Sequence, residues 1–455
     1  MADEPGQPPA LTTLSLAEKA PASKAVAQVV TPFDVSGGVD ESGKLLPVDY
    51  DKLVREFGAT RISKELLERF ERVTGRRPHR FMRRGIVFSH RDLNLILDRY
   101  EKGQPFYLYT GRGPSSDSMH VGHTIPFEFT KCVVHFLLDV SENELTRMAL
   151  PDGCRMSLIA LWLSCLQTTR RKYMHSQKIE VDDAKKYAKA NAKDIIAVGF
   201  DMKKTFIFSD FDFVGGAFYE NICRMAKRIT INSVRGTFGF NDSNNVGEFH
   251  FCATQSATAF ATSFPHIFGT DRKKVSSIPC LIPCAIDQDP YFRQCREHAE
   301  KMKYKKPSLI HAIFLPALQG PGSKMSASVE TSAIFMNDAP NRIKNKINKY
   351  AFSGGQDTAE LQRQLGANTK DDVPFQYLTF FMEDDEELER IRVAYEKGEM
   401  LTGEVKQKCI AELQAYVQAF QERRAQVTDE IVAEFMRPRS LEWKGNPNPI
   451  VVEKK

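Results

Sequence analysis

The spacing of apolar residues divides the chain into a part where strands alternate with helices and a part that is almost entirely helical. Short apolar runs bounded by turn residues predict buried strands at 106–110, 204–210, 280–286 and 309–318. Helical patterns at 120–138, 183–198 and 215–231 lie between them. Strands that alternate with helices in this way predict a parallel sheet with helices on its faces.

The pattern changes after about residue 330, where apolar residues recur at helical spacing. Ile343 and Ile347 mark one face of a Lys-rich helix, and further helices are expected at 384–398, 403–423 and 428–436. Helical patterns also fill residues 50–105. Residues 1–29 are rich in Pro, Ala and Ser and lack aromatic residues, so a disordered tail is expected there.

Composition excludes several classes of protein. A chain of 455 residues predicts two or three domains, and no stretch approaches the roughly 18 apolar residues of a membrane span. The nine Cys are scattered, which favours a reducing compartment, and Cys280 and Cys284 lack the second pair that a zinc site needs. The early acids Asp3 and Glu4 and the late first arginine, Arg55, favour the cytosol over an organelle. A net charge of +5 permits nucleic-acid binding without arguing for it.

A cluster of five arginines lies in the segment GRRPHRFMRRG, residues 75–85. One interpretation is a phosphate-binding patch. The other, which charge alone favours, is an ordinary surface neutralised by acids such as Asp92.

The first motif that carries chemistry is HVGH, residues 120–123, directly after the Gly-rich turn TGRGPSS. A helix that begins here offers free N–H groups and a partial positive charge to phosphate. His120 and His123 are three residues apart and share one helix face, so both can donate to an anion. Gly122 leaves room for a flat ring to approach the backbone. The alternative is a pair of structural histidines at the start of a core helix.

The second motif is KMSAS, residues 324–328, in a polar loop after the predicted strand at 309–318. A lysine among Gly and Ser on a loop can fold over a polyphosphate and add positive charge where negative charge develops. Alone, this segment is equally well explained as a solvated loop. Its occurrence about 200 residues after HVGH, in the same chain, favours a nucleotide site instead.

These motifs resemble the HIGH and KMSKS signatures of the class I aminoacyl-tRNA synthetases. The strings FYLYTGRGPSS, RRGIVFSHRD, CLIPCAIDQDPYFR and AFSGG are similar to those of the eukaryotic cytosolic tryptophanyl-tRNA synthetases, and the resemblance covers about residues 75–138 and 174–437. It implies a Rossmann-type parallel-sheet catalytic domain followed by an all-helical anticodon-binding domain. The expected boundaries are a tail (1–29), a mostly helical N-terminal extension (30–105), the catalytic domain (106–330), the anticodon-binding domain (331–426), a segment returning to the catalytic domain (427–443) and a tail (444–455).

The resemblance also implies a reaction. Tryptophan would attack the α-phosphate of ATP, with Mg²⁺, to give tryptophanyl-adenylate, and tRNA(Trp) would then accept the tryptophan. The implied catalytic residues are His120, His123, Lys324 and Ser326. The implied ATP-binding residues are Thr110, Gly111, Arg112, Gly113, Gly122, Asp287, Met325 and Ser328, and the tryptophan-binding residues are Tyr109, Gln255 and Gln288.

The family further implies a cytoplasmic homodimer with neither a membrane anchor nor a protein-held metal. The lysines of the helix after Asp338 are candidates for tRNA contacts, each equally well explained as part of a solvated face. No editing domain is expected, because smaller amino acids lose contact energy in a tryptophan pocket.

Residues 139–172 depart from the family pattern, in which a strand ends in a motif like LVIQLTDDEK and supplies a substrate-binding glutamine. Reading the codons of 156–171 one base earlier allows DVPDCPLVILLTDDEK, and 140–155 can begin and end with splice signals. We interpret 140–155 as translated intron and 156–171 as frame-shifted exon; the alternative is a lineage-specific insertion. This hypothesis predicts a chain that lacks a core strand and the glutamine, since Gln167 lies in the wrong frame, and that has little activity.

Three alternative functions stay open at this stage. A tyrosyl-tRNA synthetase shares both signatures, although AIDQDPYFR argues against it. A small-molecule adenylyltransferase shares HVGH but would not need KMSAS or the helical C-terminal part. A catalytically impaired, synthetase-derived RNA-binding protein is supported by the anomalous segment alone.

Overall fold

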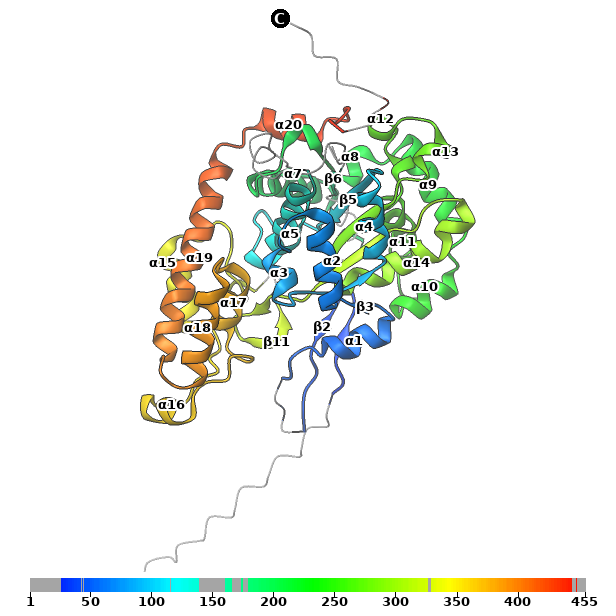
Figure 1. The fold of residues 1–455 in the computed structure, drawn as a ribbon. Helices are drawn as coiled ribbons and strands as arrows, with labels where there is room; N and C mark the ends of the chain where they lie inside the picture. The colour runs from blue at the N-terminus through cyan, green and yellow to red at the C-terminus, as the bar shows by residue number, and fades with distance from the viewer. Residues whose placement is uncertain are drawn as a thin grey trace, which may run out of the picture.

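A seven-stranded sheet forms the centre of the α/β part, with helices on both sides (Figure 1). Its order is β3-β4-β9-β8-β5-β6-β7. The strands are β3 (Thr60–Arg61), β4 (Val87–Arg91), β5 (Phe106–Gly111), β6 (Ala160–Cys165), β7 (Thr205–Phe208), β8 (Cys280–Ala285) and β9 (Ser308–Ala312). The computed structural model describes residues 26–41, 43, 45–114, 116–138, 160–165, 173–174, 179–325, 329–443 and 447.

The five strands from β9 to β7 run parallel, as the alternation of strands and helices predicted. The Rossmann-type fold is therefore confirmed, with one addition at the edge. β4 and β3 pair antiparallel beyond β9, and β4 lies within residues 50–105, where only helices were expected. The predicted strand at 309–318 is also too long. β9 ends at Ala312, and β10 (Pro316–Ala317) belongs to a second sheet, since Pro316 has no N–H with which to continue the ladder.

The structure corrects the expectation that the anomalous segment leaves the sheet without a core strand. β6 lies between β5 and β7, in register from Phe106 opposite Ala160 to Gly111 opposite Cys165. Parallel pairing uses main-chain groups that every non-proline residue offers, so the apolar run ALWLSC can fill the position. The remaining residues of the segment, 139–159 and 166–172 with Gln167, lie outside the described residues.

A smaller sheet joins the N-terminal part to the strand that ends in the KMSAS lysine. Its order is β1 (Val29–Val30), β2 (Val35–Ser36), β11 (Gly320–Lys324) and β10. Ser36 pairs with Ser323, and the amide of Gly37 donates to the carbonyl of Gly322 at 3.0 Å. Residues far apart in sequence thus hold the start of the KMSAS motif.

The helices surround the sheet in three groups. The N-terminal helices are α1 (Tyr50–Phe57), α2 (Lys64–Thr74), α3 (Arg80–Arg83) and α4 (Leu93–Glu101). The helices of the α/β part are α5 (Val121–Leu138), α7 (Val181–Ala197), α8 (Asp210–Phe213), α9 (Gly216–Ala226), α10 (Ile231–Phe238), α11 (Val246–Ala257), α12 (Pro265–Phe268), α13 (Arg272–Val275) and α14 (Asp289–Ala299). The C-terminal helices are α15 (Pro340–Tyr350), α16 (Ala359–Leu365), α17 (Val373–Phe381), α18 (Asp385–Glu396), α19 (Thr402–Ala425) and α20 (Asp429–Met436). None of the helices in the described ranges is long and apolar enough to cross a membrane.

The arginine cluster at 75–85 does not pair with Asp92, which pairs with Arg296 instead. Four of the five arginines pair with Glu383 and Asp385, at the junction of α17 and α18. Arg83 and Arg84 both pair with Asp385, and Arg84 also donates to the main-chain carbonyls of Thr379, Met382 and Glu383. The arginines therefore satisfy carbonyl groups at the C-terminal end of α17, where a helix carries partial negative charge.

Helix α19 returns from the C-terminal helices to pack against α5 and α7. The hydroxyl of Tyr416 donates to Thr124 Oγ1 in α5 at 2.7 Å. Arg424 pairs with Asp194 of α7, which is buried. Both contacts fix the helical part against the two helices that flank HVGH.

Candidate active site

The HVGH motif is held at the start of α5 by the chain segment that follows KMSAS. The amide of Val121 donates to the carbonyl of Ile334 at 2.9 Å, and His120 forms an isolated β-bridge with Phe335. These bonds join main-chain atoms of residues more than 200 positions apart. The two sequence motifs are therefore parts of one structure.

The two motifs approach each other at Gly122. A Cβ atom added at Gly122 would lie 3.1 Å from Met325 Sδ and 3.2 Å from His120 Nδ1. Such distances are tighter than most Cβ contacts, so a larger residue here would require Met325 or His120 to move by a few tenths of an ångström. The space that Gly122 leaves open, where a flat ring is expected, is bordered by Met325 and the His120 ring.

His120 and His123 lie face to face, with ring centroids 3.4 Å apart and an angle of 23° between the rings. The expectation that they share one helix face is confirmed. The main-chain amide of His120 donates to Nδ1 of His123 at 3.3 Å. Because Nδ1 accepts, a neutral His123 ring carries its proton on Nε2, which can donate to an anion.

Side chains of α7 support the Gly-rich turn between β5 and α5. Arg112 is only 5% exposed, and its Nε donates to Asn191 Oδ1 at 2.6 Å. Burial lowers the pKa of Arg112 to about 9. Its buried Nη2 has no hydrogen-bond partner within the described part of the chain. In this structure Arg112 braces the turn, and its predicted contact with ATP stays a prediction.

Sequence reasoning missed the two α7 residues that support this turn. Asn191 donates to the carbonyl of Ser116 at 2.9 Å, and Asp194 accepts the amide of Met119 at 3.1 Å. Both side chains are buried. Polar residues on the apolar face of NAKDIIA, beside Ala192 and Ile195, were the available signal, because buried polar groups need partners.

The residues expected on the tryptophan side come from three elements. Tyr109 is buried in β5 with its ring 6.2 Å from that of Phe292, in an edge-to-face arrangement. Gln255 in α11 is 5% exposed, and its Oε1 has no hydrogen-bond partner among the described residues. Ala253 and Ala257, two residues to either side of Gln255, belong to the same apolar cluster as Tyr109. Through these two alanines α11 packs in the same apolar cluster as β5, while Gln255 lies on another face of the helix.

Asp287 and Gln288 follow β8, at the same edge of the sheet as the end of β5. Asp287 is buried and Gln288 is half-buried. Thr110 donates to the carbonyl of Pro283 at 3.0 Å and so joins the two strands just before these turns. The ends of β5 and β8 therefore meet at this edge. Five of the predicted site residues lie at the end of β5 or directly after β8: Tyr109, Thr110, Gly111, Asp287 and Gln288.

The remaining predicted residues are placed only in part. Gly111 ends β5, Gly113 follows in the turn, and the backbone of Lys324 ends β11 opposite Pro316. Ser326 and Ser328 lie outside the described residues. No group of three or more His, Cys, Asp or Glu that could hold a metal ion occurs in the ranges that the structure describes.

Comparison with known proteins places this arrangement in a family. The model of the class I tRNA synthetases for tryptophan and tyrosine (W and Y) matches residues 101–418. The cytoplasmic tryptophan–tRNA ligase of Saccharomyces cerevisiae is 53% identical over 416 residues, which are 91% of this chain and 90% of that protein. The human cytoplasmic tryptophan–tRNA ligase is 52% identical over 398 residues, 87% of this chain and 79% of that protein.

Solved structures agree with the sequence matches. The tryptophanyl-tRNA synthetase of Plasmodium falciparum superposes with a TM-score of 0.74 at 38% identity, covering 86% of this chain and 95% of that one. The enzyme of Encephalitozoon cuniculi, solved bound to tryptophan, has a TM-score of 0.74 at 38% identity and covers 86% and 99% of the two chains. With HVGH and KMSAS joined at the ends of a parallel sheet, the chain belongs to the tryptophanyl-tRNA synthetases of class I.

Proposed function

We propose that this chain is a tryptophan–tRNA ligase in which the junction of HVGH and KMSAS carries the nucleotide chemistry. The supporting observation is the main-chain pairing of 334–336 with HVGH together with the close approach of Met325 to Gly122. The relatives that are about half identical are tryptophan–tRNA ligases, so the tyrosine alternative is not favoured.

The first step is the attack of the tryptophan carboxylate on the α-phosphate of ATP. The new bond joins a carboxylate oxygen to phosphorus, and the bond to the pyrophosphate oxygen breaks. Negative charge grows on the departing pyrophosphate, so the site needs positioning and positive charge rather than a covalent nucleophile. We assign His120, His123, Lys324 and Ser326 to this charge.

The remaining ATP contacts are proposed along the Gly-rich turn and the KMSAS loop. The proposed residues are Thr110, Gly111, Arg112, Gly113, Gly122, Asp287, Met325 and Ser328. Magnesium is expected to arrive with ATP as part of the substrate. Mg²⁺ in such sites is held largely by substrate phosphates and one or two carboxylates.

Tryptophan offers one polar group on its side chain, the indole N–H. We propose that Tyr109, Gln255 and Gln288 recognise it and the amino acid's other polar atoms. The buried Oε1 of Gln255 supports this, because a buried acceptor without a protein partner costs free energy that a bound donor would recover.

The second substrate is tRNA(Trp), and the C-terminal helices are proposed to read its anticodon. Lys344 and Lys349 are exposed on α15 and are candidates for phosphate contacts. Lys346 is 5% exposed and pairs with Asp338, so it is not available to RNA. The relatives' names place them in the cytoplasm, which is the proposed location.

A homodimer is proposed as the assembly. Tyr219, Ile231 and Val246 are large apolar side chains that are more than half exposed, and they come from the neighbouring helices α9, α10 and α11. Sedimentation analysis of the chain with and without acidic substitutions at these residues tests this proposal.

The test of the function is tryptophan-dependent exchange of pyrophosphate into ATP. Exchange with tryptophan and little or none with tyrosine supports the proposal, and a preference for tyrosine contradicts it. Aminoacylation of tRNA(Trp) transcript separates a ligase from a small-molecule adenylyltransferase, which would ignore tRNA.

The anomalous segment needs its own experiment. The frame-restored chain lacks 140–155 and carries DVPDCPLVILLTDDEK in place of 156–171. The frame hypothesis predicts that this chain exchanges pyrophosphate far faster than the chain as given, because it regains the acids of the TDDEK motif. Equal rates, or a mature transcript that encodes 140–171 as they stand, would refute it. Absence of exchange after restoration would favour the RNA-binding alternative.

A further inference from the structure

Four polar side chains form a connected chain behind the Asp287–Gln288 turn. Ser89 and Arg91 come from β4, His311 from β9 and Asp289 from the first turn of α14. Ser89 Oγ lies 2.9 Å from His311 Nδ1, and His311 Nε2 lies 3.1 Å from Asp289 Oδ1. Arg91 donates to both oxygens of Asp289, at 2.6 and 2.8 Å. None of this belongs to the nucleotide chemistry described above.

The chain of contacts is buried. The side chains of His311 and Asp289 are fully shielded from solvent. Burial alone would raise the pKa of Asp289, but His311 and the hydrogen bonds from Arg91 hold it well below its usual value. Among the described residues, the contact of His311 Nε2 with Asp289 is close without being an aligned hydrogen bond. Arg91 therefore supplies the two hydrogen bonds that hold the carboxylate.

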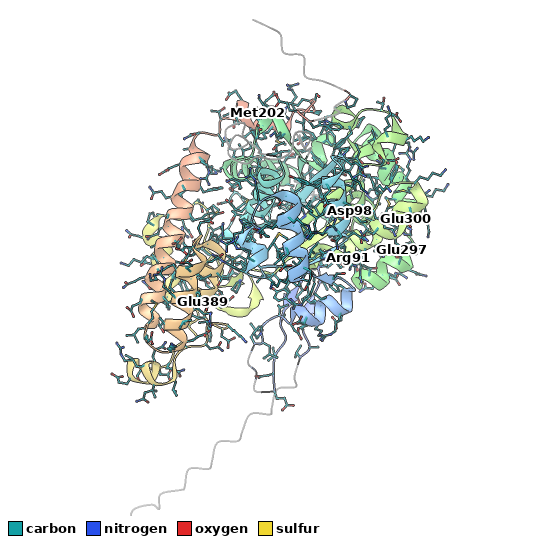
Figure 2. All side chains as sticks on the ribbon, viewed as in Figure 1. Arg91, Asp98, Met202, Glu297, Glu300 and Glu389 are labelled. Carbon is teal, nitrogen blue, oxygen red and sulfur yellow. The ribbon has the colours of Figure 1, made fainter. Side chains whose placement is uncertain are left out.

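The same chain of contacts reaches the N-terminal extension. Arg91 also donates to the carbonyls of Phe57 and Gly58, where α1 ends. Arg293, one turn into α14, lies 3.7 Å from Asp289, and its guanidinium is 5.4 Å from the centre of the Phe57 ring. In Figure 2, Arg91 lies on the side of the molecule where Glu297 of α14 is labelled. Asp289 thus joins α1, β4, β9 and α14.

Stability is a poor explanation for this arrangement. Burying two charges costs desolvation energy that their attraction barely repays, so apolar residues of similar size would serve stability as well. What a bidentate Arg–carboxylate pair adds is fixed geometry. Here that geometry is imposed on the residue that directly follows Gln288.

We propose that Asp289 is a positioning residue, held by Arg91 and His311, that fixes the Asp287–Gln288 turn for tryptophan binding. The proposal rests on the function proposed above, since it is there that Asp287 and Gln288 receive their roles. It makes β4 and the end of α1, outside the Rossmann-type unit, a working part of the active site. A rigid supporting contact of this kind is what keeps a binding group within a fraction of an ångström of its productive place.

The test compares Asp289→Asn with Asp92→Asn. Asp92 pairs with Arg296 at 2.6 Å, so it also joins the N-terminal extension to α14, but near the far end of that helix. Pyrophosphate exchange is measured in the full chain and in its frame-restored counterpart. We expect Asp289→Asn to raise the KM for tryptophan about tenfold or more, with a smaller change in the KM for ATP, and Asp92→Asn to leave both unchanged.

Amide hydrogen exchange of 286–293 gives a readout that does not depend on activity. We expect faster exchange at these amides in Asp289→Asn and not in Asp92→Asn. Ser89→Ala, which removes only the hydroxyl that orients His311, should show the same pattern more weakly and guards against a variant that fails to fold.

Two results overturn the proposal. One is an unchanged KM for tryptophan in Asp289→Asn. The other is a loss of protection spread over the whole chain, as a purely structural residue would give. If the unsubstituted and frame-restored chains both show no tryptophan-dependent exchange, the proposed function fails, and amide exchange at 286–293 still decides whether Asp289 positions the turn.

Discussion

The HVGH turn and the Asp287–Gln288 turn follow neighbouring parallel strands, β5 and β8, but they are held in different ways. The HVGH turn is fixed by main-chain hydrogen bonds and by a glycine that lets Met325 approach. The Asp287–Gln288 turn is backed by buried charges on Arg91 and Asp289. Main-chain bonds survive most side-chain changes, whereas a buried charge fails when one partner is removed. The two halves of the site should therefore differ in their sensitivity to single substitutions and to pH.

The largest expected effect concerns a buried ion pair beside the segment that pairs with HVGH, rather than the main-chain bonds of the HVGH turn itself. Lys346 pairs with Asp338 at 2.7 Å and donates to the carbonyl of Ala333, next to the segment that pairs with HVGH. Lys346→Met leaves Asp338 buried without that partner and should lower the free energy of unfolding by about 3–5 kcal/mol. Denaturant unfolding measures it, with the exposed Lys344→Met as the matched control that should change little. Equal losses of unfolding free energy in Lys346→Met and Lys344→Met would contradict this expectation, because they would show that burial of the lysine does not matter.

The next effect concerns space rather than charge. Gly122→Ala brings a Cβ to within 3.1 Å of Met325 Sδ and should cost about 1–3 kcal/mol of stability and slow pyrophosphate exchange. Gly236→Ala is the control, because nothing lies within 4 Å of that position in α10 and alanine favours a helix. The double variant Gly122→Ala with Met325→Ala should recover part of the loss. Full tolerance of Gly122→Ala would mean that the close approach is dispensable.

A smaller effect is expected in the pH dependence of the unfolding free energy, which should differ between variants of the Asp287–Gln288 turn and of the HVGH turn. The pKa of Asp289 is lowered in the folded state, so its contribution to stability is present at neutral pH. It is lost as the pH falls below about 4 and through the folded-state pKa. Asp289→Asn should therefore reduce the difference in unfolding free energy between pH 7 and pH 3 by at least about 1 kcal/mol, the size of a one-unit pKa difference. Gly122→Ala should leave that difference unchanged, and a parallel change in both variants would contradict the comparison.

The smallest expected effect tests whether burial, rather than the number of charges, determines how much an ion pair contributes to stability. Arg77 pairs with Asp385 at 3.2 Å, but its side chain is 68% exposed. Arg77→Gln should change the free energy of unfolding by less than about 0.5 kcal/mol, since exposed pairs are screened by water and salt. Thermal unfolding at low and high salt measures it, and a loss above about 1 kcal/mol would show that exposed and buried pairs count alike here.

Local patterns sufficed to predict the strands at β5, β7 and β8 and the helices α5, α7, α18, α19 and α20. The two motifs that identify the family were also visible in the sequence, because each combines rare residues with a suitable turn or loop. The sequence pattern did not reveal β4, since VFSHR is short and follows five arginines that suggested a surface. The sequence pattern also did not predict contacts between residues far apart in the chain. Asp385, for example, is about 300 residues from the arginines with which it pairs.

The same contrast between local motifs and distant contacts holds for the site. HVGH and KMSAS could be picked out in the sequence, but the residues that contact the HVGH turn, such as Asn191 and Phe335, carry no local signature. Lys346 looked like its exposed neighbours Lys344 and Lys349, and only the fold reveals that it is buried on Asp338. The sheet position of β6 was predicted to be empty because the family's residues are missing. Main-chain pairing filled it nevertheless, since hydrogen bonding between strands does not depend on the identity of the side chains.

The pairing of Ser36 with Ser323 has a consequence for synthesis on the ribosome. The partner of the N-terminal β2 strand is translated 287 residues later, which at about 5–20 residues per second is a delay of roughly 15–60 seconds. Until β11 has been synthesised, β2 lacks its partner strand on that edge, and the edge stays open to chaperones and proteases. Assembly of the sheet that holds the start of KMSAS is therefore a late event in the synthesis of the chain, and a nascent chain that ends before residue 323 cannot form it.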